Sequence, residues 1–369
     1  MNPRDCFLAA LRGGKADRVP LALEGFARAT REKADAIEDP AAREIAHRVF
    51  DHVVVRRSCN SFVNRHFVTP PQFIREVDRK AADDTLTITS EIRTPKGPLT
   101  TVAQRNRQTD TVWTVKYPVE SPADIDKIRS IPWELPAKLA PPDLSKLPEN
   151  FREKCILSAS VSSPFVCAAG MMSYESFLAL CATDLALVEE LTAECTDRVL
   201  AVLEVLLAPG TIEYVWMGGC EWLTPPMGSP RLYEKLVQEP EKRVIDRIHQ
   251  SGALSHVHCH GKVRSTLKLT VQRGADYFEP VEPPPDGDVT FAEAKQIVAG
   301  RMTLGGNIEA RILANQSADV VEKVTREAFE GGGHRMVLKA TAGPIDRMTP
   351  GHLANYHRMI DVWEELSPL

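Results

Sequence analysis

Short apolar runs alternate with longer amphipathic stretches along most of the chain. The runs at 155–161 and 214–217 predict buried strands, because a parallel strand covered on both faces is apolar along its length. The stretches between such runs repeat apolar residues at helical spacing, as Val244, Ile245 and Ile248 do. This pattern predicts strands at 18–25, 52–58, 155–161, 211–219, 253–260, 275–279, 302–306 and 335–339.

The predicted strands alternate with helices, and eight parallel strands joined by helical crossovers are typical of a (β/α)8 TIM barrel. The whole chain, 1–369, is therefore predicted to form a single barrel domain. A doubly wound open sheet is the alternative architecture, but it would be expected to carry a phosphate-binding glycine motif. The sequence contains neither GxGxxG nor GxxxxGK followed by Ser or Thr.

Two segments interrupt the alternation of strands and helices. Residues 85–90 and 112–117 alternate in polarity, and Pro95, Lys96 and Gly97 supply a turn between them. This pattern predicts an inserted antiparallel β-hairpin at 84–117, with one face in contact with water. The segment 132–148 is rich in proline and is predicted to run over the surface as a linker.

Composition and charge exclude several functional classes. The apolar fraction of 43% and the charged fraction of 26% are those of a globular domain. A net charge of −5 argues against non-specific nucleic-acid binding, which requires a basic surface. No apolar run approaches the roughly 20 residues that span a bilayer. The eight cysteines include no CxxC pair, which indicates reduced thiols in a cytoplasmic protein.

The candidate chemistry begins at the end of the strand predicted at 253–260. Side chains alternate along a strand, so His256, His258 and His260 are expected on one face and Cys259 on the other. A His-x-His pair at a strand end is a plausible half of a transition-metal site. His256 lies further down the strand and is expected to be a hydrogen-bonded core residue.

Polar residues also follow the other predicted strands. In a barrel these strand ends meet at one mouth, which should then be lined by Glu24, Ser58, Asn60, Ser160, Ser162, Cys220, Glu221, Glu279, Glu282, Asn307, Glu309, Lys339 and Thr341. Glu221 or Cys220 could close a zinc site with His258 and His260, because catalytic zinc commonly has three protein ligands and an open position. The alternatives are an ion pair for Glu221 and a buried thiol for Cys220. Glu282 is a candidate acid or ligand, or a solvated loop charge.

Several passages resemble the uroporphyrinogen decarboxylase superfamily, including its zinc methyltransferases that exchange methyl groups with corrinoid proteins. The resemblance covers nearly the whole chain, and its passages are 17–20, 218–230, 258–261, 274–276, 305–308 and 337–353. It implies a (β/α)8 barrel, in agreement with the strand count.

The chain departs from both patterns of that superfamily. The decarboxylases carry an arginine-bearing MRQAGR-like loop after the first strand, where this chain reads Leu23-Glu24-Gly25-Phe26-Ala27-Arg28, so porphyrinogen decarboxylation is not expected. The zinc methyltransferases use His-x-Cys at strand five and a cysteine after strand eight. Here the first motif is His258-x-His260, and Ala342 stands at the second position. Imidazole and carboxylate ligands would leave zinc a stronger Lewis acid, suited to polarising an oxygen atom.

The resemblance therefore predicts a zinc-dependent methyltransferase that moves a methyl group between a small O-, N- or S-methyl compound and a corrinoid protein or other carrier. The predicted ligands are His258, His260 and Glu221, and Glu282, Asn60 and Tyr174 are the predicted catalytic or positioning residues. The alternatives are a decarboxylase or lyase acting on a small anionic substrate, and a non-catalytic protein that docks a corrinoid carrier. A homodimer is also a possible partner state.

Overall fold

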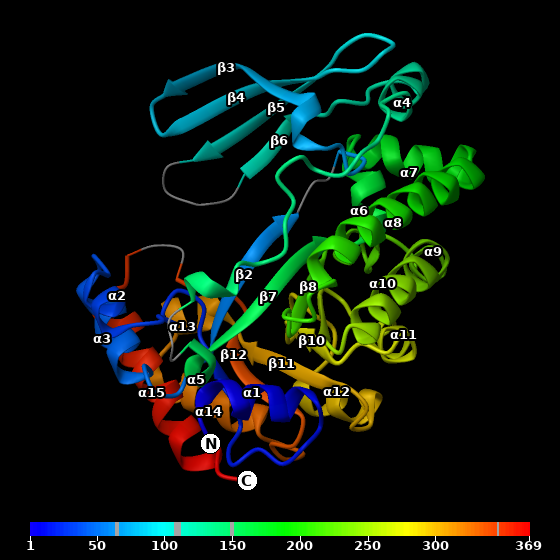
Figure 1. Cartoon of the computed structure of the whole chain (residues 1–369). Helices are drawn as coiled ribbons and strands as arrows, with labels where there is room; N and C mark the ends of the chain where they lie inside the picture. The colour runs from blue at the N-terminus through cyan, green and yellow to red at the C-terminus, as the bar shows by residue number, and fades with distance from the viewer. Residues whose placement is uncertain (63–65, 107–111, 148–150, 345–346) are drawn as a thin grey trace.

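A computed structural model of the chain describes residues 1–62, 66–106, 112–147, 151–344 and 347–369, with the side chains of 60–62 and 146 outside the description (Figure 1). Eight strands form one parallel sheet: β1 (Leu21–Ala22), β2 (Val55–Phe62), β7 (Cys155–Ser162), β8 (Tyr214–Gly218), β9 (Leu254–His258), β10 (Tyr277–Glu279), β11 (Thr303–Ile308) and β12 (Met336–Ala340). Each overlaps a strand predicted from the sequence, and most are apolar runs buried on both faces, whereas β2 is polar and residues 56–58 are exposed.

The sheet curls in the order β1-β12-β11-β10-β9-β8-β7-β2. This is the order of a (β/α)8 barrel, in which consecutive strands are neighbours. The two edge strands are not joined by a ladder in the described residues, and a single parallel bridge between Leu21 and Val53 links this part of the sheet. The predicted α/β class, the eight parallel strands and their order are thus confirmed, whereas the described strands form a curled sheet that is not closed into the predicted barrel.

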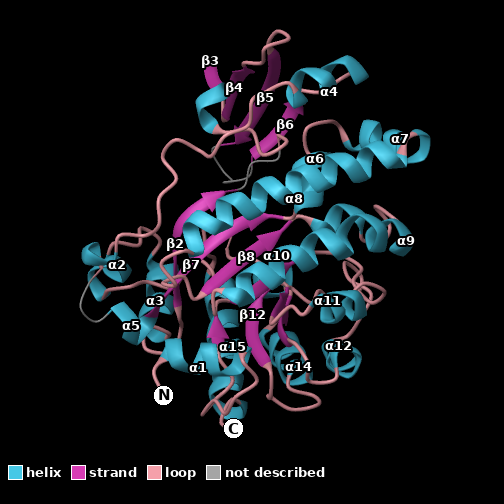
Figure 2. Cartoon of the chain, turned by 45° about the vertical axis from the view of Figure 1, so that its right-hand side comes forward, coloured by secondary structure: helices cyan, strands magenta, loops and turns pink. Residues whose placement is uncertain are grey.

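Helices pack on the outer side of the curled sheet (Figure 2). They are α2 (Arg31–Asp35), α3 (Pro40–Arg48), α5 (Phe151–Lys154), α6 (Pro164–Ala169), α7 (Tyr174–Thr183), α8 (Leu185–Leu207), α9 (Pro230–Tyr233), α10 (Glu239–Gln250), α11 (Leu267–Arg273), α12 (Phe291–Val298), α13 (Ala310–Asn315), α14 (Ala318–Ala328) and α15 (Pro350–Leu366). The short turns η3 (Cys220–Leu223) and η4 (Glu234–Gln238) link β8 to α10 through α9. No helix of the described chain is long and apolar enough to cross a bilayer.

Two apolar layers lie on opposite faces of the sheet. The larger one fills the space between the strands and the outer helices. The smaller one lies inside the barrel, where α1 (Pro3–Leu11) closes the bottom and places Phe7 against Tyr214 and Tyr277, with ring centroids 6.0 and 5.9 Å apart. Because side chains alternate along each strand, the inner and outer faces contain different residues.

The insertion is larger than the predicted hairpin. Four antiparallel strands, β3 (Ile74–Ala82), β4 (Thr85–Ile92), β5 (Leu99–Asn106) and β6 (Val112–Lys116), form a separate sheet at the top of Figure 1. β4 and β6 were expected, whereas β3 is charged and exposed along most of its length and shows no clear alternation. The short helix η1 (Pro71–Phe73) precedes β3, and α4 (Pro122–Arg129) follows β6. In the described part of the proline-rich segment, helical structure is limited to η2 (Leu144–Lys146).

Gly305 on β11 marks the tightest packing of the inner face. A Cβ at this position would overlap the Tyr277 hydroxyl and lie 2.8 Å from the Cβ of Glu279. We expect Gly305→Ala to lower the free energy of unfolding by about 1–3 kcal/mol, because overpacking forces neighbours from their rotamers. Gly14→Ala is the control, since its Cβ would meet only the Ala9 carbonyl at 3.5 Å. Equal denaturant midpoints for the two variants would contradict this packing.

Candidate functional site

A cavity of about 480 Å³ lies inside the barrel. Its walls are partly aromatic, with Phe7 from α1 and Tyr214, Trp216 and Tyr277 from the strands. Its polar lining consists of Glu24, Arg56, Ser58, Ser158, Ser160, His256, Glu279 and Lys339. Several strand-end residues therefore converge as expected for a barrel, where ligands bind at this end of the strands.

Glu279 at the end of β10 is the centre of the polar contacts in the cavity. Its side chain is 2% exposed, and Oε1 lies 2.8 Å from both His256 Nε2 and His258 Nδ1. The Lys339 ammonium donates to Oε2. Burial alone would raise the pKa of Glu279, but the charge of Lys339, followed by that of His258, holds it well below its usual value. Glu279 is thus a buried carboxylate.

The charges continue from Lys339 toward the opposite wall. Lys339 Nζ lies 3.2 Å from Glu24 Oε1, and Arg56 NH2 lies 3.5 Å from the same oxygen. Burial opposes the charge of Lys339, but Glu279 and Glu24 overcome it and raise the lysine pKa. Arg56 keeps 35% of its side chain accessible and faces the cavity. Each cation in this row therefore lies beside a carboxylate, because a charge removed from water must be paired.

His256 is a neutral imidazole. Burial lowers its pKa to about 3, although Glu279 acts in the opposite direction. Nδ1 is hydrogen-bonded to the Tyr214 hydroxyl on the adjacent strand. Nε2 is buried and lies near Glu279, outside hydrogen-bonding geometry. The expected core histidine is therefore satisfied at one nitrogen, and the other nitrogen faces Glu279.

His256, His258 and Glu279 form a candidate metal-binding group. One ligand atom from each lies within 4.8 Å of the other two. Two imidazoles and a carboxylate are a ligand set of catalytic zinc, with a further position open for substrate. The Tyr214 hydroxyl on His256 and the Lys339 ammonium on Glu279 orient the ligands in the way that outer partners do at metal sites. The donor set therefore fits zinc.

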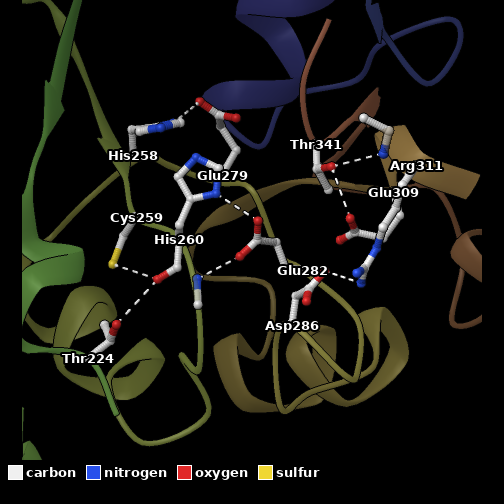
Figure 3. A network of polar contacts seen from close by, with 12 residues as sticks. Thr224, His258, Cys259, His260, Glu279, Glu282, Asp286, Glu309, Arg311 and Thr341 are labelled. Carbon is white, nitrogen blue, oxygen red and sulfur yellow. Dashed lines mark hydrogen bonds and ion pairs between the residues drawn. The ribbon is translucent and has the colours of Figure 1, made fainter. Parts of the chain in front are cut away.

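His260 and Glu282 form an ion pair at the rim of the barrel (Figure 3). His260 Nδ1 lies 2.7 Å from Glu282 Oε1, and the Gly261 amide donates to Oε2 at 2.6 Å. Burial opposes protonation of His260, but Glu282 outweighs it and the histidine pKa is raised. The His260 ring lies 4.7 Å from that of His258. This pair adds a charged, partly exposed group beside the candidate metal ligands.

Glu309 lies beyond the rim, between Thr341 and Arg311 (Figure 3). It is 7% exposed, accepts a 3.4 Å hydrogen bond from the Thr341 hydroxyl, and its Oε1 is buried without a partner. Burial, followed by the charges of Glu282 and Asp286, raises the pKa of Glu309 to about 7. Glu309 is therefore a carboxyl group that titrates near neutrality.

Cys220, Glu221 and Cys259 form a second candidate metal-binding group, with ligand atoms within 4.8 Å of one another. Cys220 is 1% exposed and Cys259 is fully buried. Both thiols belong to the core between sheet and helices, not to the cavity lining. As expected from the alternation along β9, Cys259 lies away from the histidines, and no disulfide joins any of the eight cysteines in the described residues.

The residues predicted as metal ligands are distributed over three places. His258 lies with His256 and Glu279, Glu221 lies with the thiols, and His260 pairs with Glu282. The Tyr174 hydroxyl donates to the carbonyls of Trp222 and Met227, so it holds the loop after η3. Asn60 pairs through its backbone with Ala159 in the sheet, and its side chain lies outside the described residues.

Arg56 lines the cavity but was not predicted as a site residue. The sequence did contain a signal for it. The run Val55-Arg56-Arg57-Ser58 places 56 and 58 on one face of a strand, and Ser58 was expected at the mouth. A charged residue inside a predicted barrel strand is costly unless it is paired, and therefore indicates function.

Residues 105–363 match the sequence model of the uroporphyrinogen decarboxylase (URO-D) family. No curated protein matches the chain. A solved methyltransferase from Methanosarcina mazei has a TM-score of 0.62 at 15% identity, covering 99% of this chain and 99% of that chain. A B12-independent methionine synthase from Shewanella sp. W3-18-1, solved with selenomethionine, has a TM-score of 0.42 at 11% identity, covering 79% of this chain and 76% of that chain. At these identities the structural likeness concerns the fold alone.

Removing the Lys339 charge should leave Glu279 as an uncompensated buried anion. We expect Lys339→Met to lower the free energy of unfolding by about 3–5 kcal/mol in denaturant titrations at neutral pH. Lys323→Met is the control, because Lys323 pairs with Glu327 at 3.8 Å on an exposed surface. A loss no larger than that of the control would contradict a charged Glu279.

The raised pKa of Glu309 predicts a pH-dependent stability. The native carboxyl keeps its proton up to about pH 7, whereas the ordinary value is 4.5. The native state therefore binds more protons between these values, and stability falls as pH rises through this window. We expect the wild type to lose about 2–3 kcal/mol relative to Glu309→Gln between pH 5 and pH 8. Parallel curves for the two proteins would contradict the shift.

Proposed function

The chain belongs to the uroporphyrinogen decarboxylase family, and from this premise we propose that it is a zinc-dependent methyltransferase. One observation carries the proposal: the donor atoms of His256, His258 and Glu279 lie within 4.8 Å of one another, and two of these residues, His256 and Glu279, line the cavity. Two neighbouring strands supply the three ligands, and the cavity is large enough for a small molecule. His258 retains the role predicted from the sequence, and His256 and Glu279 take the places assigned there to His260 and Glu221.

The chemistry of the donor set supports zinc in particular. Neutral imidazole and carboxylate bind borderline metal ions, and such ligands leave the ion a strong Lewis acid. Bound there, zinc would polarise the heteroatom that carries the methyl group and make it a better leaving group. Tyr214 and Lys339 would hold the ligands in place, and the aromatic walls would exclude water from the substrate.

The cavity lining supports a small, polar methylated substrate. Its aromatic rings suit an apolar body, and Arg56 and Glu24 offer one charge of each sign. We propose an O-, N- or S-methyl compound as donor and a corrinoid protein as methyl carrier. The His260–Glu282 pair at the rim could exchange a proton with the demethylated product, and a homodimer is our proposed assembly.

A second candidate is a decarboxylase or lyase acting on a small anionic substrate. The accessible Arg56 guanidinium in the cavity favours it, because guanidinium binds carboxylate in a bidentate manner. Release of carbon dioxide from a carboxylate substrate without methyl turnover would support this alternative.

Metal analysis of single variants tests the proposed ligands. We expect His258→Ala to lose about one zinc ion per chain relative to wild type after dialysis, because removal of one of three protein ligands greatly weakens zinc binding. His260→Ala is the matched control and should keep its zinc, since His260 is paired with Glu282. Equal loss in both variants would instead favour the ligand set predicted from the sequence. No change in His258→Ala would contradict both sets.

Methyl transfer can be measured with cob(I)alamin as a surrogate carrier. The wild type is expected to convert it to methylcobalamin, followed by absorbance, in the presence of small O-, N- and S-methyl compounds. Transfer should fall by at least about 100-fold in His258→Ala, a loss typical of a disrupted metal site. Zinc binding without methyl transfer from any compound, to free cobalamin or a corrinoid protein, would contradict the proposed activity.

A further inference from the structure

Cys220, Glu221 and Cys259 lie on the outer face of the strands whose inner face carries the candidate active site. Cys220 and Glu221 follow β8 in η3, and Cys259 follows β9 directly. Their ligand atoms are within 4.8 Å of one another, although the two segments are far apart in sequence. Two sulfur atoms and a carboxylate oxygen make a softer donor set than the imidazoles in the cavity.

One carboxylate oxygen of the half-buried Glu221 has no hydrogen-bond partner. Its Oε2 is buried without a hydrogen bond, and in the described part of the chain Glu221 forms no ion pair. The neighbouring carboxylate of Glu241 is fully buried but lies 3.0 Å from the Arg273 guanidinium. A buried, unpaired carboxylate oxygen is costly, and a cation at this position would remove the cost.

Both thiols are buried inside the protein. Cys259 Sγ points to the His260 carbonyl, and both thiols pack in the sheet–helix core with Tyr233 of α9. Their hydrogen bond to each other and burial raise the pKa of Cys259 well above its usual value. A bound divalent ion deprotonates coordinating thiols, so both cysteines would bind it as thiolates.

We propose that Cys220, Cys259 and Glu221 bind a second, structural zinc ion. Binding would release the two thiol protons to solvent and form two zinc–sulfur bonds and two zinc–oxygen bonds to a bidentate Glu221 carboxylate, the four donors of a structural site. The ion would tie the end of β8 to the end of β9, directly beside His258. The three ligands take no part in the chemistry of the proposed methyl transfer, because they do not line the cavity.

Cobalt substitution of the full chain distinguishes this site from the one in the cavity. The Co²⁺-loaded wild type should show a sulfur-to-cobalt charge-transfer band, because two thiolates are ligands. We expect Cys259→Ser and Cys220→Ser to lose this band and His258→Ala to keep it. Cys195→Ser is the matched control, since Cys195 is fully buried in the same core but outside the group.

A wild type without the charge-transfer band would overturn the proposal, as would a band that persists in both cysteine variants. Should these variants fail to fold, X-ray absorption of the zinc-loaded wild type provides the same answer. A sulfur shell at about 2.3 Å supports the thiolate site, and only nitrogen or oxygen neighbours at about 2.0–2.2 Å would refute it. Absence of methyl transfer in a protein that retains the sulfur shell would contradict the proposed function but not the structural zinc site.

Discussion

The buried carboxylate of Glu279 is the constraint on which the inner face of the barrel depends. An isolated carboxylate cannot remain ionised in an apolar core, so every neighbour must compensate for its charge or its hydrogen-bonding demand. Lys339 supplies the opposite charge, and His256 and His258 place nitrogen atoms against the same oxygen. Lys339 in turn requires Glu24, and Glu24 lies beside Arg56. These charged contacts connect four strands. A substitution at one of the charged positions therefore leaves a charge on a neighbouring strand without its partner.

The same constraint explains why glycine stands at 305. The Tyr277 hydroxyl and the Cβ of Glu279 occupy the space that a side chain on β11 would need. These charged side chains fit inside the barrel only because residue 305 on the neighbouring strand β11 is a glycine without a side chain. Buried ion pairs of this kind contribute little net stability, since desolvation offsets their attraction. Their retention inside a barrel fits a role in binding a ligand rather than in folding.

The sequence was sufficient for the eight parallel strands, because uniform apolar runs and amphipathic helices have distinct periods. It failed for β3, whose exposed charged residues lack any alternation, and so it underestimated the inserted sheet. For the site, the alternation along β9 correctly separated Cys259 from His258. The sequence does not show how deep in a barrel a residue lies. His256 was therefore predicted to be a core histidine and not a metal ligand. Gly219, with φ of 117°, turns the chain out of the strand, so alternation along β8 could not place Glu221.

The end of β9 then has two chemically different sides. Toward the cavity it presents imidazoles, which with Glu279 prefer a borderline ion and leave it electrophilic. Toward the helices it presents a thiol, which with Cys220 and Glu221 offers softer donors in a site closed to substrate. Catalytic zinc needs an open position, and structural zinc does not. Because the two groups are on opposite faces of one strand end, an ion held on the outer side would restrict the backbone that positions His258. Side-chain alternation along β9 keeps the two sets of ligands on opposite faces. Because both sets share the same backbone, an ion bound by one set would affect the position of the other.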